Sequence, residues 1–161
     1  MKKLPIGIQD IKKIRTQGFV YVDKTQFARA LIEGDAPHYF LSRPRRFGKS
    51  LFVSTLAEIF SGNKALFEGC HIARSSFDWL SYPVLFFNFG GVANDTTEKL
   101  EAHLHGLITK MGEAQGIKVQ EASLEFRLTV LVEALAPKGQ VVVLIDEYDK
   151  PIIDHIHNVE I

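Results

Sequence analysis

The chain has a single cysteine, Cys70, among its 161 residues, so it cannot form an internal disulfide. It has no apolar run long enough to cross a bilayer, and Met1-Lys2-Lys3 leads into mixed polar sequence rather than into a signal peptide. We therefore expect a cytoplasmic protein without a membrane partner. Basic and acidic residues number 19 each, so the net charge indicates no class of ligand.

The charge is nevertheless distributed unevenly along the chain. Residues 1–50 carry 11 Lys or Arg against 4 Asp or Glu, a net charge of +7, and residues 51–161 carry 8 against 15, a net charge of −7. A basic first third suits a polyanionic ligand, although the same side chains could only solvate an N-terminal arm.

Alternating strand and helix signals predict an α/β fold with a parallel sheet flanked by helices. Short apolar segments predict strands at 38–42, 84–89 and 140–145, and the last two are apolar enough for buried strands. Periodic apolar residues and capping residues predict helices at about 25–33, 48–61, 96–114, 123–136 and from 149 onward. We expect irregular chain at 62–81.

The first predicted strand leads into Arg43-Pro44-Arg45-Arg46-Phe47-Gly48-Lys49-Ser50, directly before a predicted helix. The unpaired N–H groups at a helix N-terminus bind anions, and Gly48 lets the backbone approach one closely. Lys49 would then neutralise the β- and γ-phosphates of a nucleotide, and the Ser50 hydroxyl would ligate magnesium. The standard loop has a glycine where this chain has Arg43, so an ordinary basic turn is the alternative.

The last predicted strand ends in Asp146-Glu147, at the carboxyl edge where parallel sheets bind ligands. Asp146 can hold magnesium there, and Glu147 can orient or deprotonate an attacking water. A solvated strand end is the alternative.

The two motifs together predict one site for ATP and Mg²⁺. We predict that Glu147 and Lys49 are catalytic, and that Ser50 and Asp146 hold the metal ion. The residues predicted to contact the nucleotide form one continuous segment: Arg45, Arg46, Phe47, Gly48, Lys49, Ser50 and Leu51. The loop arginines could instead pair with acidic residues, perhaps near Asp146 or Asp149. The hypothesis requires residues 48–50 and 146–147 to converge around one triphosphate.

These motifs, with Tyr21-Val22-Asp23-Lys24-Thr25 upstream and Tyr148-Asp149-Lys150-Pro151-Ile152 downstream, resemble a family of AAA-ATPase-like proteins. Members often carry a C-terminal nuclease-superfamily domain of the PD-(D/E)XK type. Arg-Pro-Arg-Arg-Phe-Gly-Lys-Ser is similar to that family's own phosphate loop. The resemblance implies a P-loop NTPase domain of the ASCE division, with ATP hydrolysis as the full-length activity. It also implies DNA or another nucleic acid as a partner of a nuclease-like domain, and a homo-oligomer as one option.

In ASCE ATPases the strand after the acidic one inserts between it and the phosphate-loop strand, and it carries a sensor for the γ-phosphate. This chain ends at Ile161, after the Walker B segment. We therefore expect 1–161 to be the N-terminal part of such a domain, with a lead-in at 1–36 and the nucleotide-binding core at 37–161. Two alternatives stay open: a regulatory module that binds nucleotide or nucleic acid without turnover, and a small-molecule kinase. The Asp146-Glu147 pair argues against the kinase.

Overall fold

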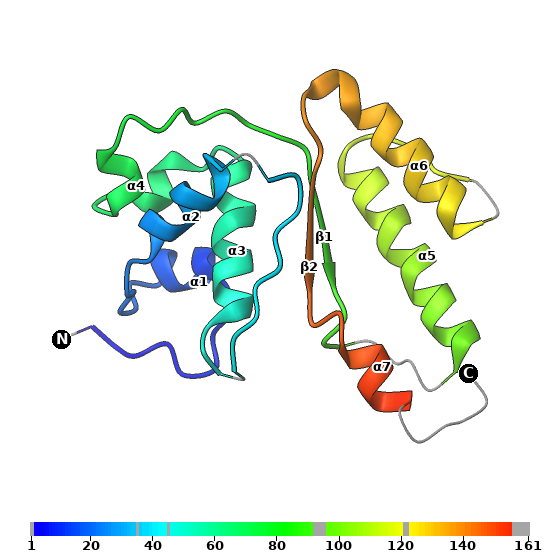
Figure 1. The fold of residues 1–161 in the computed structure, drawn as a ribbon, viewed down its shortest axis with the longest axis horizontal. Coiled ribbons are helices and arrows are strands. Elements are labelled where there is room, and N and C mark those ends of the chain that lie inside the picture. The colour runs from blue at the N-terminus through cyan, green and yellow to red at the C-terminus, as the bar shows by residue number, and fades with distance from the viewer. Residues whose placement is uncertain (1, 35, 45, 92–95, 121–122, 156–161) are drawn as a thin grey trace. The chain divides into compact units, whose positions relative to one another are not determined.

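A computed structural model describes residues 2–34, 36–44, 46–91, 96–120 and 123–155 of the chain. The chain divides into two compact units, Met1–Ser81 and Tyr82–Ile161, and each unit is described by itself (Figure 1). The predicted division at residue 36 stays a prediction. No helix in the described ranges is both long and apolar enough to cross a membrane.

The first unit is helical. Its elements are α1 (Ile11–Thr16), α2 (Thr25–Ile32), α3 (Lys49–Phe60), the 3₁₀ helix η1 (Lys64–Phe67) and α4 (His71–Arg74). They share a core whose apolar members are Ile11, Ile14, Ala28, Phe52, Leu56, Ile59, Phe67, Cys70 and Ile72. The phosphate-loop helix predicted at 48–61 is confirmed as α3, and the helix predicted from residue 25 is confirmed as α2.

Two short helices correct the sequence-based picture of this unit. The lead-in contains α1, which begins where the Asp10 carboxylate accepts a hydrogen bond from the Lys13 backbone N–H at 3.0 Å. The segment at 62–81, which we expected to be irregular, contains η1 and α4. Both α1 and α4 are anchored by fully buried isoleucines rather than by a long periodic pattern, so the sequence alone gave little sign of them.

The strand predicted at 38–42 is wrong for this structure. Residues 36–44 form no regular element, and Phe40 is 72% exposed. A strand is held by hydrogen bonds to a neighbouring strand, and the described part of the first unit contains none. An apolar segment without such a partner stays extended or irregular.

The segment before α2 ties that helix to α4. The two oxygens of the Asp23 carboxylate accept hydrogen bonds from different helices. Oδ1 accepts from the N–H and the hydroxyl of Thr25, at 2.9 and 2.7 Å, and Oδ2 accepts from the His71 N–H at 2.7 Å. The Thr25 hydroxyl accepts from Ile72 N–H at 3.1 Å. Burial raises the pKa of Asp23, but the hydrogen bonds from Thr25 and His71 outweigh it and lower the pKa below its ordinary value.

The second unit has mixed α/β structure. Its elements are β1 (Val84–Asn88), α5 (Thr97–Ala114), α6 (Leu124–Leu135), the 3₁₀ helix η2 (Ala136–Lys138), β2 (Val142–Asp146) and α7 (Lys150–His155). The two strands pair in parallel, in a register that runs from Val84 opposite Val142 to Asn88 opposite Asp146. The predicted α/β class is therefore confirmed at a coarse level, as a small parallel sheet with helices.

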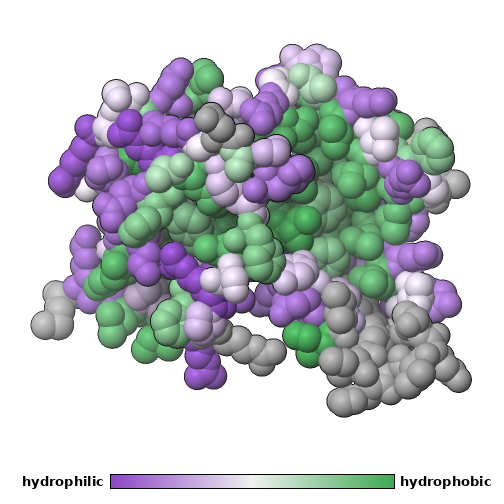
Figure 2. Space-filling model, viewed as in Figure 1, coloured by the Kyte–Doolittle hydropathy of each residue, from purple (hydrophilic) through white to green (hydrophobic). Residues whose placement is uncertain are grey.

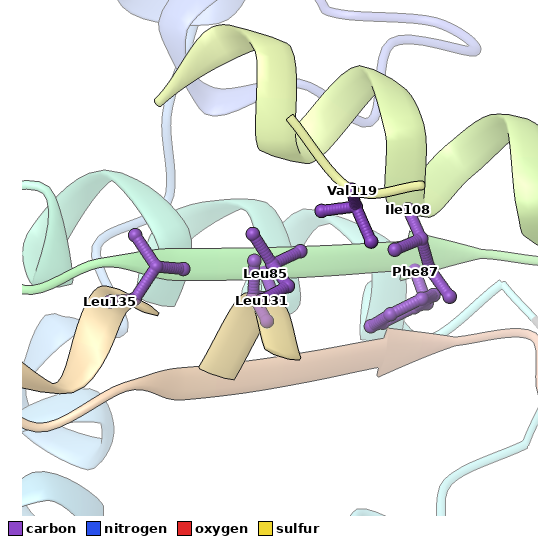
Figure 3. Packing of buried hydrophobic residues seen from close by; sticks show 6 residues of the cluster. All are labelled: Leu85, Phe87, Ile108, Val119, Leu131 and Leu135. Carbon is purple, nitrogen blue, oxygen red and sulfur yellow. The ribbon is translucent and has the colours of Figure 1, made fainter. Parts of the chain in front are cut away.

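Helices α5 and α6 cover one face of β1. Leu85 and Phe87 point from β1 toward these helices, where Ile108, Val119, Leu131 and Leu135 complete the core (Figure 3). The helices predicted at 96–114 and 123–136 are confirmed as α5 and α6. A side chain caps each of them: Thr96 Oγ1 accepts from the Lys99 N–H at 3.3 Å, and Ser123 Oγ accepts from the Phe126 N–H at 3.3 Å.

Strand β2 is less covered than its sequence predicts. Val143 and Ile145 lie opposite Leu85 and Phe87 in the register, hence on the same face, but they are 47% and 52% exposed. The helix layer covers β1 more fully than β2, so the expectation of a wholly buried acidic strand is wrong. Figure 2 shows apolar side chains gathered over the strands and adjoining helices of this unit.

Candidate nucleotide-binding site

The loop half of the site is the N-terminus of α3. Its N-cap is Gly48, in the left-handed region at φ 76°, and no side chain caps the helix. The first backbone hydrogen bond of α3 joins Phe52 N–H to Gly48 C=O at 3.0 Å. The N–H groups of Lys49, Ser50 and Leu51 consequently have no partner within the helix, and the positive end of the helix dipole adds to their field. Such a terminus is suited to bind an anion.

The chain in front of α3 is curved in a way that supports the same interpretation. The Phe47 N–H donates to the Pro44 C=O at 3.4 Å, which closes a turn. Arg46 has φ 67°, so left-handed residues occur at 46 and 48. Alternation of this kind turns successive N–H groups toward one concave side, as in anion-binding nests. The curvature is thus present although residue 43 is not a glycine. Arg45 lies outside the described residues.

The loop is also positively charged without compensation. Among the described residues of the first unit, the only ion pair joins Arg29 to Glu33 at 2.7 Å. No ion pair within that unit therefore involves the basic side chains of the loop, Arg43, Arg46 and Lys49. Phe47 is 62% exposed beside them. The combination favours a ligand that brings several negative charges.

The acidic half of the site is the carboxyl end of β2. Asp146 is only 5% exposed. Its Oδ1 accepts from the Glu147 N–H at 3.1 Å, whereas its Oδ2 is buried and has no hydrogen-bond partner among the described residues. A buried carboxylate oxygen without a donor is costly unless a cation or a water compensates it.

A magnesium ion fits this donor. The ion takes hard oxygen ligands and is commonly held by one or two carboxylates together with phosphates and waters, so it needs no cage of protein ligands. Consistent with that, no three His, Cys, Asp or Glu side chains cluster into a metal site in the described part of the chain.

Glu147 lies directly beyond Asp146 in a constrained backbone. Its φ is 53°, in the left-handed region, and its C=O accepts from the Lys150 N–H at 3.0 Å as α7 begins. Its carboxylate lies against Gly90, just beyond the end of β1, and the Gly90 N–H donates to Asn88 Oδ1 at 2.8 Å. Sequence reasoning missed Asn88 and Gly90. The signal available was the Gly90-Gly91 pair directly after the strand predicted at 84–89.

Backbone strain marks both halves. Arg46 and Glu147 are the only non-glycine residues with positive φ in the described ranges. Such conformations cost about 1–3 kcal/mol each, and they are concentrated at functional sites.

The two halves belong to different units. Arg46, Phe47, Gly48, Lys49, Ser50 and Leu51 are in the first unit, whereas Asp146 and Glu147 are in the second. The roles of both halves, and their convergence around one ligand, stay predictions.

Comparison with known proteins points the same way. Residues 5–161 match the model of a family described as predicted AAA-ATPase, which supports an ATP-binding domain. The chain is 49% identical over 164 residues to a protein of Azotobacter chroococcum mcd 1 named "Uncharacterized protein in vnfD 5'region". That alignment covers 99% of this chain but 31% of the relative, so the chain spans about a third of the length of the curated protein it matches. No solved structure matches the chain.

Proposed function

Since this chain belongs to the predicted AAA-ATPase family, we propose that it binds ATP with Mg²⁺ and that Mg-dependent ATP hydrolysis is the full-length activity. The observation that carries the proposal is the uncapped N-terminus of α3, which presents free N–H groups beside Lys49 and Ser50. We further propose that hydrolysis is coupled to a partner module, with a nuclease-like domain acting on DNA as one candidate.

The phosphate-binding role falls to the loop. Backbone N–H groups of Gly48, Lys49, Ser50 and Leu51 would donate to phosphate oxygens at the start of the helix. The Lys49 ammonium would place a full positive charge on the β- and γ-phosphates, and Arg46 is available to pair with their oxygens bidentately.

The metal and water roles fall to Ser50 and the acidic strand. The Ser50 hydroxyl and the Asp146 carboxylate are the oxygens that would hold Mg²⁺. Magnesium, when bound there, would neutralise negative charge on the phosphate oxygens. The exposed side chain of Glu147 would accept a hydrogen bond from the attacking water and align it with the γ-phosphate.

Nucleotide affinity tests the loop. Lys49→Ala and Ser50→Ala should each weaken MgATP binding at least about tenfold, because each removes a charged or metal-ligating contact. Lys12→Ala is the matched control, since it removes an equal charge from an exposed position on α1. Unchanged MgATP affinity in both loop variants would refute the site.

A paramagnetic probe tests convergence. Mn²⁺ in place of Mg²⁺ should broaden the amide NMR signals of Ser50 and Glu147 together when ATP is present. Broadening at Ser50 alone would mean that the two halves do not share one ligand. Glu147→Gln should then bind MgATP normally and lose phosphate release, since only the water-aligning oxygen has changed.

One observation favours the second candidate, a module that binds nucleic acid without turnover. Tyr39, Phe40 and Phe47 are 48%, 72% and 62% exposed; the first two precede the basic loop, and Phe47 lies within it between Arg46 and Lys49. Exposed aromatic rings among arginines can stack on the bases of a single strand. Salt-dependent binding of single-stranded DNA that excess MgATP does not displace, with no phosphate release, would favour this module over the ATPase.

A further inference from the structure

We propose that Gly90 is a positioning residue for Glu147. Because glycine has no side chain, the Glu147 carboxylate can occupy the space that a Cβ at position 90 would fill. The inference rests on the proposed function, in which that carboxylate aligns the attacking water. It adds a residue of the neighbouring strand's turn to the acidic half of the site.

The close approach is a matter of space. A Cβ added at Gly90 would lie 2.7 Å from Glu147 Cδ, and closer still to its Oε2. It would also lie 3.1 Å from Asn88 Oδ1. Real Cβ atoms essentially never come within 3.0 Å of such atoms, so one of the groups must move when a side chain is present.

The turn that carries Gly90 is held in place. Its N–H donates to Asn88 Oδ1 at 2.8 Å, and the preceding Phe89 N–H donates to the Asp146 C=O at 3.1 Å. This second bond extends the pairing of the two strands by one residue beyond the sheet. The turn is therefore fixed to Asp146 at the end of β2, and Glu147 is the next residue along the chain.

The backbone of Glu147 is held as well. Its N–H donates to Asp146 Oδ1 and its C=O accepts from Lys150 N–H. With both backbones fixed, the group free to move is the Glu147 side chain, which can rotate about its own bonds. A methyl group at 90 would therefore displace the carboxylate while leaving its charge and its backbone unchanged.

Glycine is not needed at 90 for conformational reasons. The φ of Gly90 lies outside the left-handed region, so alanine can adopt its backbone. Gly91 gives a matched control: its φ is also outside that region, and a Cβ added there would meet no atom of the described residues within 4 Å. The two substitutions are chemically identical and differ only in what the methyl group meets.

The test compares Gly90→Ala, Gly91→Ala, Glu147→Gln and the double variant Gly90→Ala/Glu147→Gln in steady-state ATP hydrolysis by the full chain. Gly90→Ala should lower kcat about tenfold to a hundredfold, because small misplacements of a catalytic group are that costly. MgATP affinity and the unfolding midpoint should stay unchanged, and Gly91→Ala should match the wild type. The double variant should be no slower than Glu147→Gln, because both changes remove the same contribution.

Other outcomes overturn the proposal. A wild-type kcat in Gly90→Ala would do so, as would an equal loss in Gly91→Ala or a parallel loss of stability and affinity. If Glu147→Gln keeps full turnover, the water-aligning role in the proposed function fails. The positioning claim is then judged by the side-chain carboxyl ¹³C shift of Glu147: a change in Gly90→Ala but not in Gly91→Ala supports it, and no change overturns it.

Discussion

Replacing Asp146 by asparagine should stabilise the metal-free chain and remove most of the extra stability expected from MgATP. The carboxylate is 5% exposed, Oδ1 has one hydrogen bond, and Oδ2 has none among the described residues. Without a cation, this is a buried carboxylate in which Oδ2 has no hydrogen-bond partner among the described residues. Asparagine keeps the shape and the Oδ1 acceptor while removing the charge.

The magnitude follows from what remains unsatisfied. The amide group still lacks a partner, but a neutral buried group without a hydrogen bond costs less than a charged one, by about 1 kcal/mol or more. For a urea dependence of about 2 kcal/mol per molar, the unfolding midpoint should rise by about 0.5 M in EDTA. In the wild type, MgATP at a hundred times its Kd should add about 2.7 kcal/mol, and the variant should lose most of this gain.

Urea unfolding in EDTA and in saturating MgATP measures both effects. Asp149→Asn is the control, since it removes an equal charge from an exposed carboxylate three residues along the chain. If the urea midpoint of Asp146→Asn in EDTA is lower than that of the wild type, the carboxylate stabilises the fold by accepting hydrogen bonds, and the prediction is wrong. Full MgATP stabilisation in that variant would refute its role as a metal ligand.

Two further predictions concern the stability of each unit. Gly106→Ala should stabilise α5 by about 1 kcal/mol, because the added Cβ would meet no atom of the described residues within 4 Å. Gly112→Ala should destabilise the second unit by about 1–2 kcal/mol, because its Cβ would lie 2.8 Å from the Ile117 carbonyl oxygen. Thermal unfolding compares them, and shifts of equal sign would contradict the packing. The lowered pKa of Asp23 means that its stabilisation is present above about pH 4 and is lost as pH falls through the folded-state pKa. Between about pH 5 and pH 2.5 the urea midpoint of the wild type should therefore fall more than that of Asp23→Asn, and parallel curves would contradict the network.

The elements that the sequence predicted well carry their own signals. Helices α3, α5 and α6 are 12, 18 and 12 residues long, so apolar residues recur over several turns, and Thr96 and Ser123 mark two of the starts. By contrast, α1 and α4 have six and four residues, too few for a periodic pattern. The segment at 38–42 failed for another reason, since a strand depends on a partner that its own residues do not encode.

Motif reasoning did not predict the backbone conformation of two residues at the candidate site, Arg46 and Glu147. Propensity favours glycine wherever φ is positive, so neither Arg46 nor Glu147 was predicted to be left-handed. At Glu147 that conformation is fixed by the Asp146 Oδ1 acceptor and the first turn of α7, and it accompanies a carboxylate seated against Gly90. The acidic pair and the glycine turn after β1 therefore lie together in the structure, although 54 residues separate Gly91 from Asp146 in the sequence. Arg46 likewise stands just before the uncapped N-terminus of α3, so each left-handed residue borders a segment for which the sequence predicts a ligand contact, as expected where backbone strain serves function rather than propensity.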